Sequence, residues 1–245
     1  MSSYPISKSR CPECAKLGKD TSHDNLITYS DGHSYCFGCG HRTGGSGLSR
    51  IVNRQEEVVN NQVLSLPLDS SYEYPKVALD WVGQYELDRN DLIRHRVIWS
   101  DYFERLIFPV FDETGLLGYQ GRYLGNKEGK AKWWGQGRLE EILHILKSED
   151  DSCIILVEDI VSAIKLQKVG HTSMPIFGSH LSLSRLNRIG RYYKDVVIWL
   201  DPDKRKESIL FQTRAKTVGL KARVIFSDKD PKEHTNVDIK RILQN

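Results

Sequence analysis

The sequence predicts an α/β protein, with a small all-β module followed by a larger region built on a mainly parallel sheet. Apolar runs at 154–157, 196–200 and 223–226 alternate with segments of helical spacing. This alternation is typical of a parallel sheet covered by helices. Two Cys-x-x-Cys pairs precede these runs in a chain of 245 residues, a length that suits one large domain or two smaller ones.

The four cysteines of the two pairs are spaced to hold one metal ion. Cys11 and Cys14 are separated by 21 residues from Cys36 and Cys39, which is typical of a zinc ribbon with four thiolates around one Zn²⁺. Because the protein supplies all four ligands, we expect the zinc to be structural. It should provide much of the folding free energy of so small a module. The remaining cysteine, Cys153, is interpreted as a small core residue.

A hairpin is expected between the two cysteine pairs. Tyr29, Tyr35 and Phe37 alternate with polar residues around a turn that contains Asp31. The rings, together with His33, could contact unpaired nucleic-acid bases, or the rings could pack over the zinc. The spacing does not choose between these interpretations.

Composition divides the chain into four segments. A Gly- and Ser-rich edge closes the zinc module at 1–50, and the polar run after it predicts a flexible linker at 51–72. Residues 73–150 begin with a helical pattern and continue with a strand–turn–strand unit, in which Pro109 indicates an edge or a bulge. Residues 151–245 hold the predicted parallel sheet.

A basic, glycine-rich loop follows the strand–turn–strand unit. Lys127, Lys130 and Lys132 are interleaved with glycines and precede Trp133 and Trp134. Such a loop is typical of a contact with phosphate or nucleic acid. The alternative is a solvated loop with at least one tryptophan in the core.

Carboxylates follow each predicted strand of the parallel sheet. Glu158 follows the first strand, Asp201 and Asp203 follow the second, and Asp230 follows the third. Because ligands gather at the carboxyl ends of parallel strands, we expect these acids to share one crevice. Clustered carboxylates repel one another unless a cation lies among them, and oxygen ligands suit Mg²⁺ or Mn²⁺. One such acid could be a simple turn former, but three sets in order favour a metal site for phosphoryl chemistry.

The overall composition indicates an ordinary soluble chain. Charged residues make up 27% and hydrophobic residues 39%, and the formal net charge of +3 is weak support for nucleic-acid binding. No apolar run predicts a membrane span, and no apolar core follows the N-terminus as in a secretory signal. There is no Gly-x-x-x-x-Gly-Lys-Ser/Thr motif of a P-loop NTPase. We expect a cytoplasmic protein without a membrane partner.

Together these landmarks resemble the primase part of phage primase–helicases and the bacterial replicative primases. After the first cysteine pair come Asp-Gly-His-Ser-Tyr-Cys-Phe-x-Cys at 31–39, Ile-Phe-Pro at 107–109, Gly-Tyr-Gln-Gly-Arg at 118–122, Glu158, Asp-x-Asp at 201–203 and Lys-Asp-Pro-x-Glu at 229–233. The last three motifs are similar to the Toprim fold that topoisomerases share. The resemblance covers most of the chain, and the order of its motifs behind a zinc ribbon is specific.

The resemblance implies a zinc ribbon followed by a primase RNA polymerase domain with a Toprim sheet. Such a protein makes short RNA primers from NTPs on a single-stranded DNA template. By matching motif, Glu158, Asp201 and Asp203 would hold Mg²⁺ or Mn²⁺, with Asp230 as a further ligand or electrostatic partner.

The same resemblance implies the contacts with phosphate and template. Arg122 would meet phosphate of the NTP or the nucleic acid, and the lysines of the basic loop could share that work. Asp31 and His33 would be the template-reading candidates. A separate replicative helicase is the expected partner, and the host cytoplasm is the expected location if a phage encodes the chain.

The chain departs from the Toprim pattern around the first acid. Toprim proteins usually carry Glu-Gly followed by an acid three residues on, and here Asp159 and Ser162 stand at those positions. The small residues that often follow Asp-x-Asp are replaced by Arg205 and Lys206.

Two other functions stay open beside the primase. The same acids could serve a Toprim nuclease, which would cleave DNA with Mg²⁺ and without NTPs. The altered residues after Glu158 would suit a non-catalytic zinc-ribbon protein that binds nucleic acid. The zinc ribbon, linker and Arg122-bearing strand ahead of the acids favour the primase, whose chemistry is attack of a nucleotide 3′-hydroxyl on the α-phosphate of an NTP with two-metal-type assistance.

Overall fold

The computed structural model describes residues 5–16, 18, 24–30, 32–43, 64–112, 114–178 and 180–244. The chain divides into two compact units, Met1–Asn60 and Asn61–Asn245. Most of the expected linker lies outside the described residues, so its flexibility stays a prediction.

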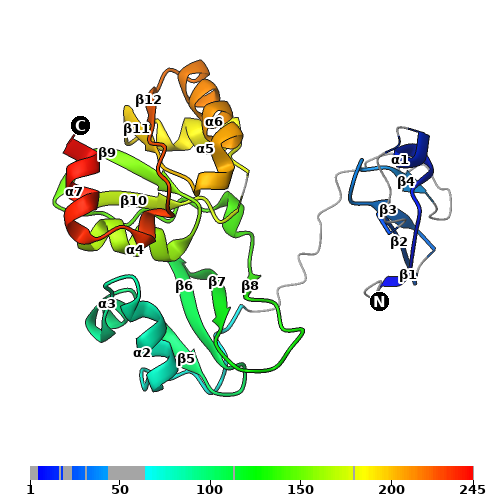
Figure 1. The fold of residues 1–245 in the computed structure, drawn as a ribbon, viewed down its shortest axis with the longest axis horizontal. Helices are drawn as coiled ribbons and strands as arrows, with labels where there is room; N and C mark the ends of the chain where they lie inside the picture. The colour runs from blue at the N-terminus through cyan, green and yellow to red at the C-terminus, as the bar shows by residue number, and fades with distance from the viewer. Residues whose placement is uncertain are drawn as a thin grey trace. The chain divides into compact units, whose positions relative to one another are not determined.

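The smaller unit is a four-stranded antiparallel sheet with one short helix. Its strands lie in the order β1-β2-β3-β4. The elements are β1 (Pro5–Ser9), α1 (Pro12–Lys16), β2 (Leu26–Tyr29), β3 (Ser34–Cys36) and β4 (Arg42–Thr43) (Figure 1). The buried cluster in its described part contains Leu26 and three cysteines, so apolar burial contributes little to its folding.

The larger unit combines two sheets. An antiparallel sheet has the strand order β5-β6-β7-β8, and a parallel sheet has the order β10-β9-β11-β12. The first part contains α2 (Lys76–Gly83), α3 (Arg89–Arg94), β5 (Ile98–Ser100), β6 (Arg105–Asp112), β7 (Gly115–Tyr123), β8 (Trp133–Gln136) and the 3₁₀ helix η1 (Leu139–Glu141). The second part contains β9 (Asp150–Val157), α4 (Ile160–Lys168), β10 (His171–Pro175), α5 (Leu183–Ile189), β11 (Asp195–Ile198), η2 (Pro202–Lys204), α6 (Arg205–Thr217), β12 (Lys221–Val224), η3 (Pro231–Glu233) and α7 (Asn236–Gln244).

Helices cover both faces of the parallel sheet, as the sequence pattern predicted (Figure 1). Strand β9 shows why its sequence is apolar throughout. Ile154 and Leu156 pack with residues of α5 and α6 on one face, whereas Ile155 and Val157 pack with residues of α4 on the other. A strand buried on both faces needs no alternation of polar and apolar residues.

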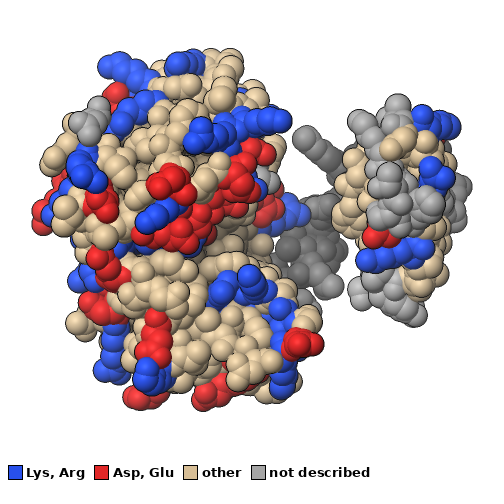
Figure 2. All heavy atoms as spheres, in the orientation of Figure 1, with Lys and Arg blue, Asp and Glu red and all other residues tan. Residues whose placement is uncertain are grey.

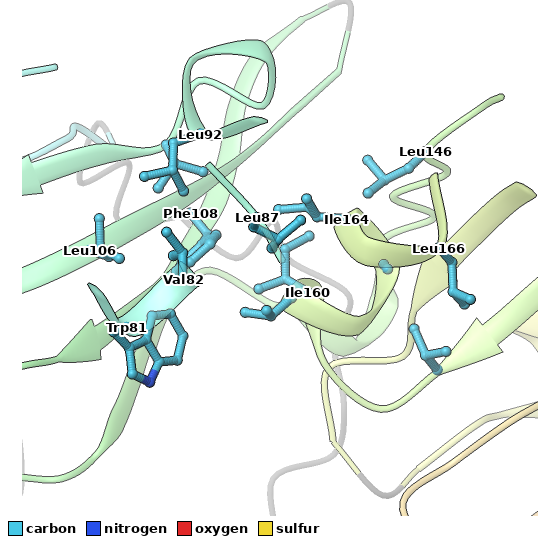
Figure 3. Packing of buried hydrophobic residues seen from close by; sticks show 14 of the residues in the cluster. Trp81, Val82, Leu87, Leu92, Leu106, Phe108, Leu146, Ile160, Ile164 and Leu166 are labelled. Carbon is cyan, nitrogen blue, oxygen red and sulfur yellow. The ribbon is translucent and has the colours of Figure 1, made fainter. Parts of the chain in front are cut away.

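One core joins the two sheets of the larger unit. Val82 of α2 and Phe108 of β6 belong to the same buried cluster as Ile160 and Ile164 of α4 (Figure 3). Helix α4 starts directly after β9, where the first predicted acid stands. This packing therefore holds the antiparallel sheet against the end of the parallel sheet that carries the acids.

The expected strand–turn–strand unit is β6 and β7. Strand β6 pairs with β5 only as far as Ile107, and the register with β7 shifts between Val110 and Phe111. Pro109 thus lies past the last β5 pair and next to a bulge, where a missing N–H disturbs the sheet least. No helix in the described parts of the chain is long and apolar enough to cross a membrane.

Candidate active site

Four cysteine sulfurs meet at one point of the smaller unit. Their Sγ atoms all lie within 4.8 Å of one another, and the pairs Cys11–Cys39 and Cys14–Cys36 are each 3.6 Å apart. Zn–S bonds of about 2.3 Å place the sulfurs of a tetrahedral site about 3.8 Å apart. The donor set and its spacing therefore fit one Zn²⁺.

Two glycines shape the loop that carries the second cysteine pair. A side chain at Gly38 would meet Cys14 Sγ at 3.3 Å and the Asn25 side chain at 3.1 Å. Gly40 has a φ of +75°, and its N–H donates to the carbonyl of Cys36 at 2.9 Å. A larger residue at either position would disturb the convergence of the sulfurs.

The hairpin aromatics lie outside the buried cysteine cluster. The rings of Tyr29 and His33 stack with centroids 4.4 Å apart, and the ring of Phe37 meets Tyr35 edge-on. The side chain of Phe37 is 64% exposed, which favours the interpretation that the hairpin contacts a partner. Asp31 lies outside the described residues.

The strands that carry the predicted acids are neighbours in the parallel sheet. Strand β9 pairs with β11 and β11 pairs with β12, so the carboxyl ends of all three lie along one edge. Glu158 follows β9, Asp201 follows β11, and Asp230 precedes η3. Figure 2 shows acidic side chains gathered in the middle of the visible face of this unit, with basic side chains among them.

Hydrogen bonds fix the loops at this edge. The indole N–H of the fully buried Trp199 donates to Ser227 Oγ at 2.9 Å, and that hydroxyl donates to the carbonyl of Lys229 at 2.7 Å. This chain of contacts ties the segment before Asp230 to the end of β11. The carbonyl of Glu158 accepts from Phe177 N at 3.1 Å, which holds the end of β9.

Two partly buried carboxylates at this edge are not fully hydrogen-bonded. Glu158 Oε2 and Asp201 Oδ1 are buried and have no hydrogen-bond partner among the described residues. Burial raises the pKa of Glu158, and burial together with the neighbouring carboxylates raises the pKa of Asp201 to about 7. Buried acids that repel one another favour a cation among them. These hard oxygen donors fit Mg²⁺ or Mn²⁺.

The acids do not converge as the cysteines do. In the described part of the chain, the cysteine cluster is the only group of three or more His, Cys, Asp or Glu side chains whose ligand atoms all lie within 4.8 Å of one another. Asp203 is 70% exposed and pairs with Lys204 at 2.8 Å. The hydrogen bond from that ammonium lowers the pKa of Asp203.

Sequence reasoning missed one basic residue of the site, Lys232. Its Nζ donates to Asp230 Oδ2 at 2.6 Å and to Asp159 Oδ2 at 2.9 Å, and its side chain is 14% exposed. Burial disfavours the ammonium, yet the two carboxylates raise the pKa of Lys232 above its usual value. The sequence offered one signal for this lysine, since Asp159 stands where Toprim proteins usually carry glycine. Its partner, however, lies 73 residues further along the chain.

Arg122 lies on the face of the antiparallel sheet that α2 covers. Its guanidinium carbon is 5.1 Å from the ring centroid of Trp81 and 5.7 Å from that of Trp133, and its Nε is buried without a partner among the described residues. Burial raises the pKa of Tyr85, and the charges of both Lys232 and Arg122 lower it. Tyr85, whose ring meets that of Trp81 edge-on, thus lies within electrostatic range of both Arg122 and Lys232.

The structure separates Arg122 from two lysines that were expected to share its work. Lys127 and Lys130 line a pocket of about 440 Å³ with Tyr102, Arg105 and Trp134. Arg105 and Trp134 point to the opposite face of the sheet from Arg122, because adjacent strand residues alternate between faces. The lysines therefore line a surface on the other face of the sheet from Arg122, and their sharing of one phosphate with it stays a prediction.

Lys132 and the two tryptophans complete the basic loop. The side chain of Lys132 is exposed, and its carbonyl accepts from Tyr123 N at 2.9 Å. Trp133 packs against the core that joins the sheets, and Trp134 packs against a smaller cluster on the other face. Cys153 is partly buried in β9.

Comparisons with known proteins point to one group. No family model matches the chain. A segment covering 45% of the chain is 28% identical to a DNA primase of Clostridium acetobutylicum and spans 20% of that primase. Among solved structures, the zinc-binding and RNA polymerase domains of the Aquifex aeolicus primase match 99% of this chain and 78% of that one, with 14% identity and a TM-score of 0.59. The chain resembles DNA primases.

Two further structures extend the likeness. The primase fragment of the bacteriophage T7 primase–helicase matches 98% of both chains, with 14% identity and a TM-score of 0.50. The catalytic domain of the DnaG primase bound to single-stranded DNA matches 71% of this chain and 76% of that one, with 16% identity and a TM-score of 0.55. These likenesses confirm the primase fold, with its zinc-binding part and its α/β part.

Proposed function

We propose that this chain is a DNA primase, a nucleotidyltransferase that joins NTPs into short RNA primers on single-stranded DNA. The observation that carries the proposal is the pair of partnerless buried oxygens, on Glu158 and Asp201, at the carboxyl edge of the parallel sheet. A primase-like fold surrounds them, with a basic side chain, Arg122, near the same edge. Metal-assisted phosphoryl transfer needs this combination of carboxylates and positive charge.

The acids would hold the divalent metal. Glu158 and Asp201 offer buried oxygens, and Asp203 offers an exposed one once Lys204 moves aside. Mg²⁺ or Mn²⁺ bound there would lower the pKa of the attacking 3′-hydroxyl and stabilise charge on the leaving pyrophosphate. Glu158 and Asp201 are partly buried, and each holds one buried oxygen without a partner among the described residues.

Arg122 would bind phosphate oxygens of the incoming NTP. The rings of Trp81 and Trp133 orient its guanidinium, and its Nε has no partner among the described residues. Planar guanidinium groups bind phosphate with two parallel hydrogen bonds. The substrate would then lie between Arg122 and the acids, next to Tyr85.

Template contacts would come from two other places. The hairpin of the zinc module, with Asp31 and His33, would read template bases, aided by the exposed ring of Phe37. Lys127 and Lys130, in their pocket with Tyr102 and Trp134, would hold the DNA strand through phosphates and stacked bases. A separate replicative helicase would supply unwound DNA, and the cytoplasm, of the host if a phage encodes the chain, would be the place of action.

The test is primer synthesis by the zinc-loaded chain on a pool of single-stranded DNA templates, with labelled NTPs and Mg²⁺ or Mn²⁺. Wild type is compared with Asp201→Asn, at the carboxyl end of β11. Asp195→Asn is the matched control, because Asp195 is an exposed acid at the opposite end of the same strand. We expect short RNAs from the wild type and the control, and none from Asp201→Asn.

Other outcomes separate the alternatives. Metal-dependent DNA cleavage without NTPs, lost in Asp201→Asn, would identify a nuclease. DNA binding with neither synthesis nor cleavage, unchanged in Asp201→Asn, would identify a binding protein. Absence of NTP incorporation on every template with both metals would contradict the proposal.

A further inference from the structure

Lys232 brings a fixed positive charge into the carboxylate cluster. It lies in η3, between Asp230 and the start of α7, and its side chain is 14% exposed. Its Nζ is 2.6 Å from Asp230 Oδ2 and 2.9 Å from Asp159 Oδ2. These are the distances of direct charge-assisted hydrogen bonds.

Asp159 has no oxygen left for a metal ion. Its Oδ1 accepts from the backbone N–H groups of Val161 and Ser162, at 2.8 and 3.0 Å, and so caps helix α4. Its Oδ2 accepts from Ser162 Oγ at 2.9 Å and from Lys232. The two residues that depart from the Toprim pattern, Asp159 and Ser162, are thus joined to each other and to the lysine.

The cluster consequently divides into two halves. In the first half, Asp159 and Asp230 share the single positive charge of Lys232. In the second half, Glu158 Oε2 and Asp201 Oδ1 are buried and have no partner in the described part of the chain. Only the second half calls for an added cation.

We infer that Lys232 acts as a built-in cation of the carboxylate edge, so that this chain binds a single divalent ion, between Glu158 and Asp201. An ammonium cannot dissociate from the protein, and its charge repels a second divalent ion from Asp159 and Asp230. The inference rests on the metal site of the proposed function, and it replaces the two-metal-type assistance expected from the sequence with one metal ion and one lysine.

The competing role for Lys232 is structural, as an ion pair that only holds η3 against α4. A purely structural lysine would leave the number of bound ions unchanged when it is removed without unfolding. If Lys232 is a built-in cation, the number of bound ions should instead rise when it is removed. Its removal frees carboxylate oxygens on Asp159 and Asp230, and a second divalent ion can then bind there.

The test is the number of Mn²⁺ ions bound per zinc-loaded chain, measured from the paramagnetic resonance signal of free Mn²⁺. Lys232→Met is compared with Lys232→Arg, which keeps the charge, and with Lys229→Met. Lys229 is exposed and belongs to the same segment, so it is the matched control. Circular dichroism of each variant shows whether the fold is kept.

We expect one bound Mn²⁺ for the wild type, Lys232→Arg and Lys229→Met, and two for Lys232→Met. Two ions bound to the wild type, or one ion bound to a folded Lys232→Met, would overturn the role of Lys232. If Lys232→Met does not fold, the number of Mn²⁺ ions bound to the wild type still decides, because the inference requires a single bound ion. A wild type that binds none would overturn the metal site itself, and with it the proposed function.

Discussion

The cysteine cluster and the carboxylate edge both gather ligands of one kind, but in opposite ways. Four sulfurs already stand within 4.8 Å of one another in a unit with almost no other buried side chains in its described part. The acids follow strands that are packed in a large hydrophobic core. Their oxygens do not all lie within 4.8 Å of one another, and a lysine, Lys232, pairs with one of them, Asp230.

This difference indicates different purposes for the two sites. A closed set of four thiolates leaves no position for a substrate, so a metal there stabilises the fold. An open set of carboxylates on a large hydrophobic core leaves positions free for substrate and metal. The metal at the first site should therefore matter for stability, and the metal at the second for activity.

Zinc removal should give the largest effect. Structural zinc contributes about 10 kcal/mol or more to folding of small modules. A strong chelator, or Cys36→Ser, should therefore unfold the smaller unit and leave the larger unit folded. Amide hydrogen exchange of each unit, read by mass spectrometry, would show this. Cys153→Ser is the matched control and should change neither unit, and exchange protection that survives zinc loss would contradict the comparison.

The fold around the acids should instead depend on a buried lysine. Lys165 Nζ, with a fully buried side chain, bonds to Glu86 Oε2 at 2.6 Å and to the carbonyl of Tyr85 at 2.9 Å, and Glu86 also accepts from Asn236 N. Because the Glu86 side chain is 46% exposed, water hydrates it when the lysine is removed, and the cost stays below that of a fully buried pair. Lys165→Met should lower the free energy of unfolding in urea by about 2–3 kcal/mol.

An exposed ion pair provides the contrast for Lys165→Met. Lys76, whose side chain is 87% exposed, pairs with Asp80 on the surface of α2. Lys76→Met should cost less than about 0.5 kcal/mol. Equal effects of the two variants would show that the buried lysine does not anchor this region.

Arg122 should matter for the NTP and Lys130 for DNA, if the two faces of the antiparallel sheet work separately. Arg122→Lys keeps the charge but loses the planar group that stacks on Trp81. It should lower kcat/KM for NTPs about 100-fold, which equals about 2.7 kcal/mol. Lys130→Ala should weaken DNA binding several-fold in a salt-dependent way and leave the KM for NTPs unchanged. A shared effect of both variants on the KM would contradict the separation.

Asp201→Asn should stabilise the metal-free protein while it abolishes activity. Asp201 is partly buried beside Glu158 and other carboxylates, and removing its charge relieves desolvation and repulsion. We expect a gain of about 1–3 kcal/mol in the free energy of unfolding without divalent ions, as is common when strained functional groups are replaced. Asp195→Asn should change it little, and a loss of stability in Asp201→Asn would contradict a functional role for its burial.

The smallest of these effects should be a loss of stability of the larger unit in mild acid, caused by two histidines. Burial lowers the pKa of His95 and of His144 to about 4. In the unfolded chain each histidine takes up its proton near the usual pKa of about 6.5. The free energy of unfolding should therefore be at its full value above that pH and fall as the pH decreases toward 4. The loss should reach about 1 kcal/mol per histidine by about pH 5.5. His144→Gln should flatten the pH dependence of urea unfolding, and an unchanged slope would contradict the assignment.

Much of the framework could be predicted from local sequence. Strand β9 is apolar throughout because both of its faces are buried, and the acids follow their strands in order, so their common edge was predictable. Asp is a preferred residue at the start of a helix, and Asp88 caps α3 through the backbone N–H groups of Asn90 and Asp91.

Two features of the site depend on tertiary structure. The contact between Lys232 and Asp159 joins positions 73 residues apart, and no spacing rule reveals it. The separation of Arg122 from Lys127 and Lys130 depends on strand register and on the path of an irregular loop. Neither has a period that a sequence pattern could show.

The most direct test of the carboxylate edge as a metal site is cleavage of the zinc-loaded chain by Fe²⁺ with ascorbate and peroxide. Iron bound in place of Mg²⁺ generates radicals that cut the backbone close to the ion. The structure predicts cuts near Glu158, Asp201 and Asp230, suppressed by excess Mg²⁺ and absent in Asp201→Asn. Cuts elsewhere, or cuts that persist unchanged in Asp201→Asn, would show that these acids do not hold the metal.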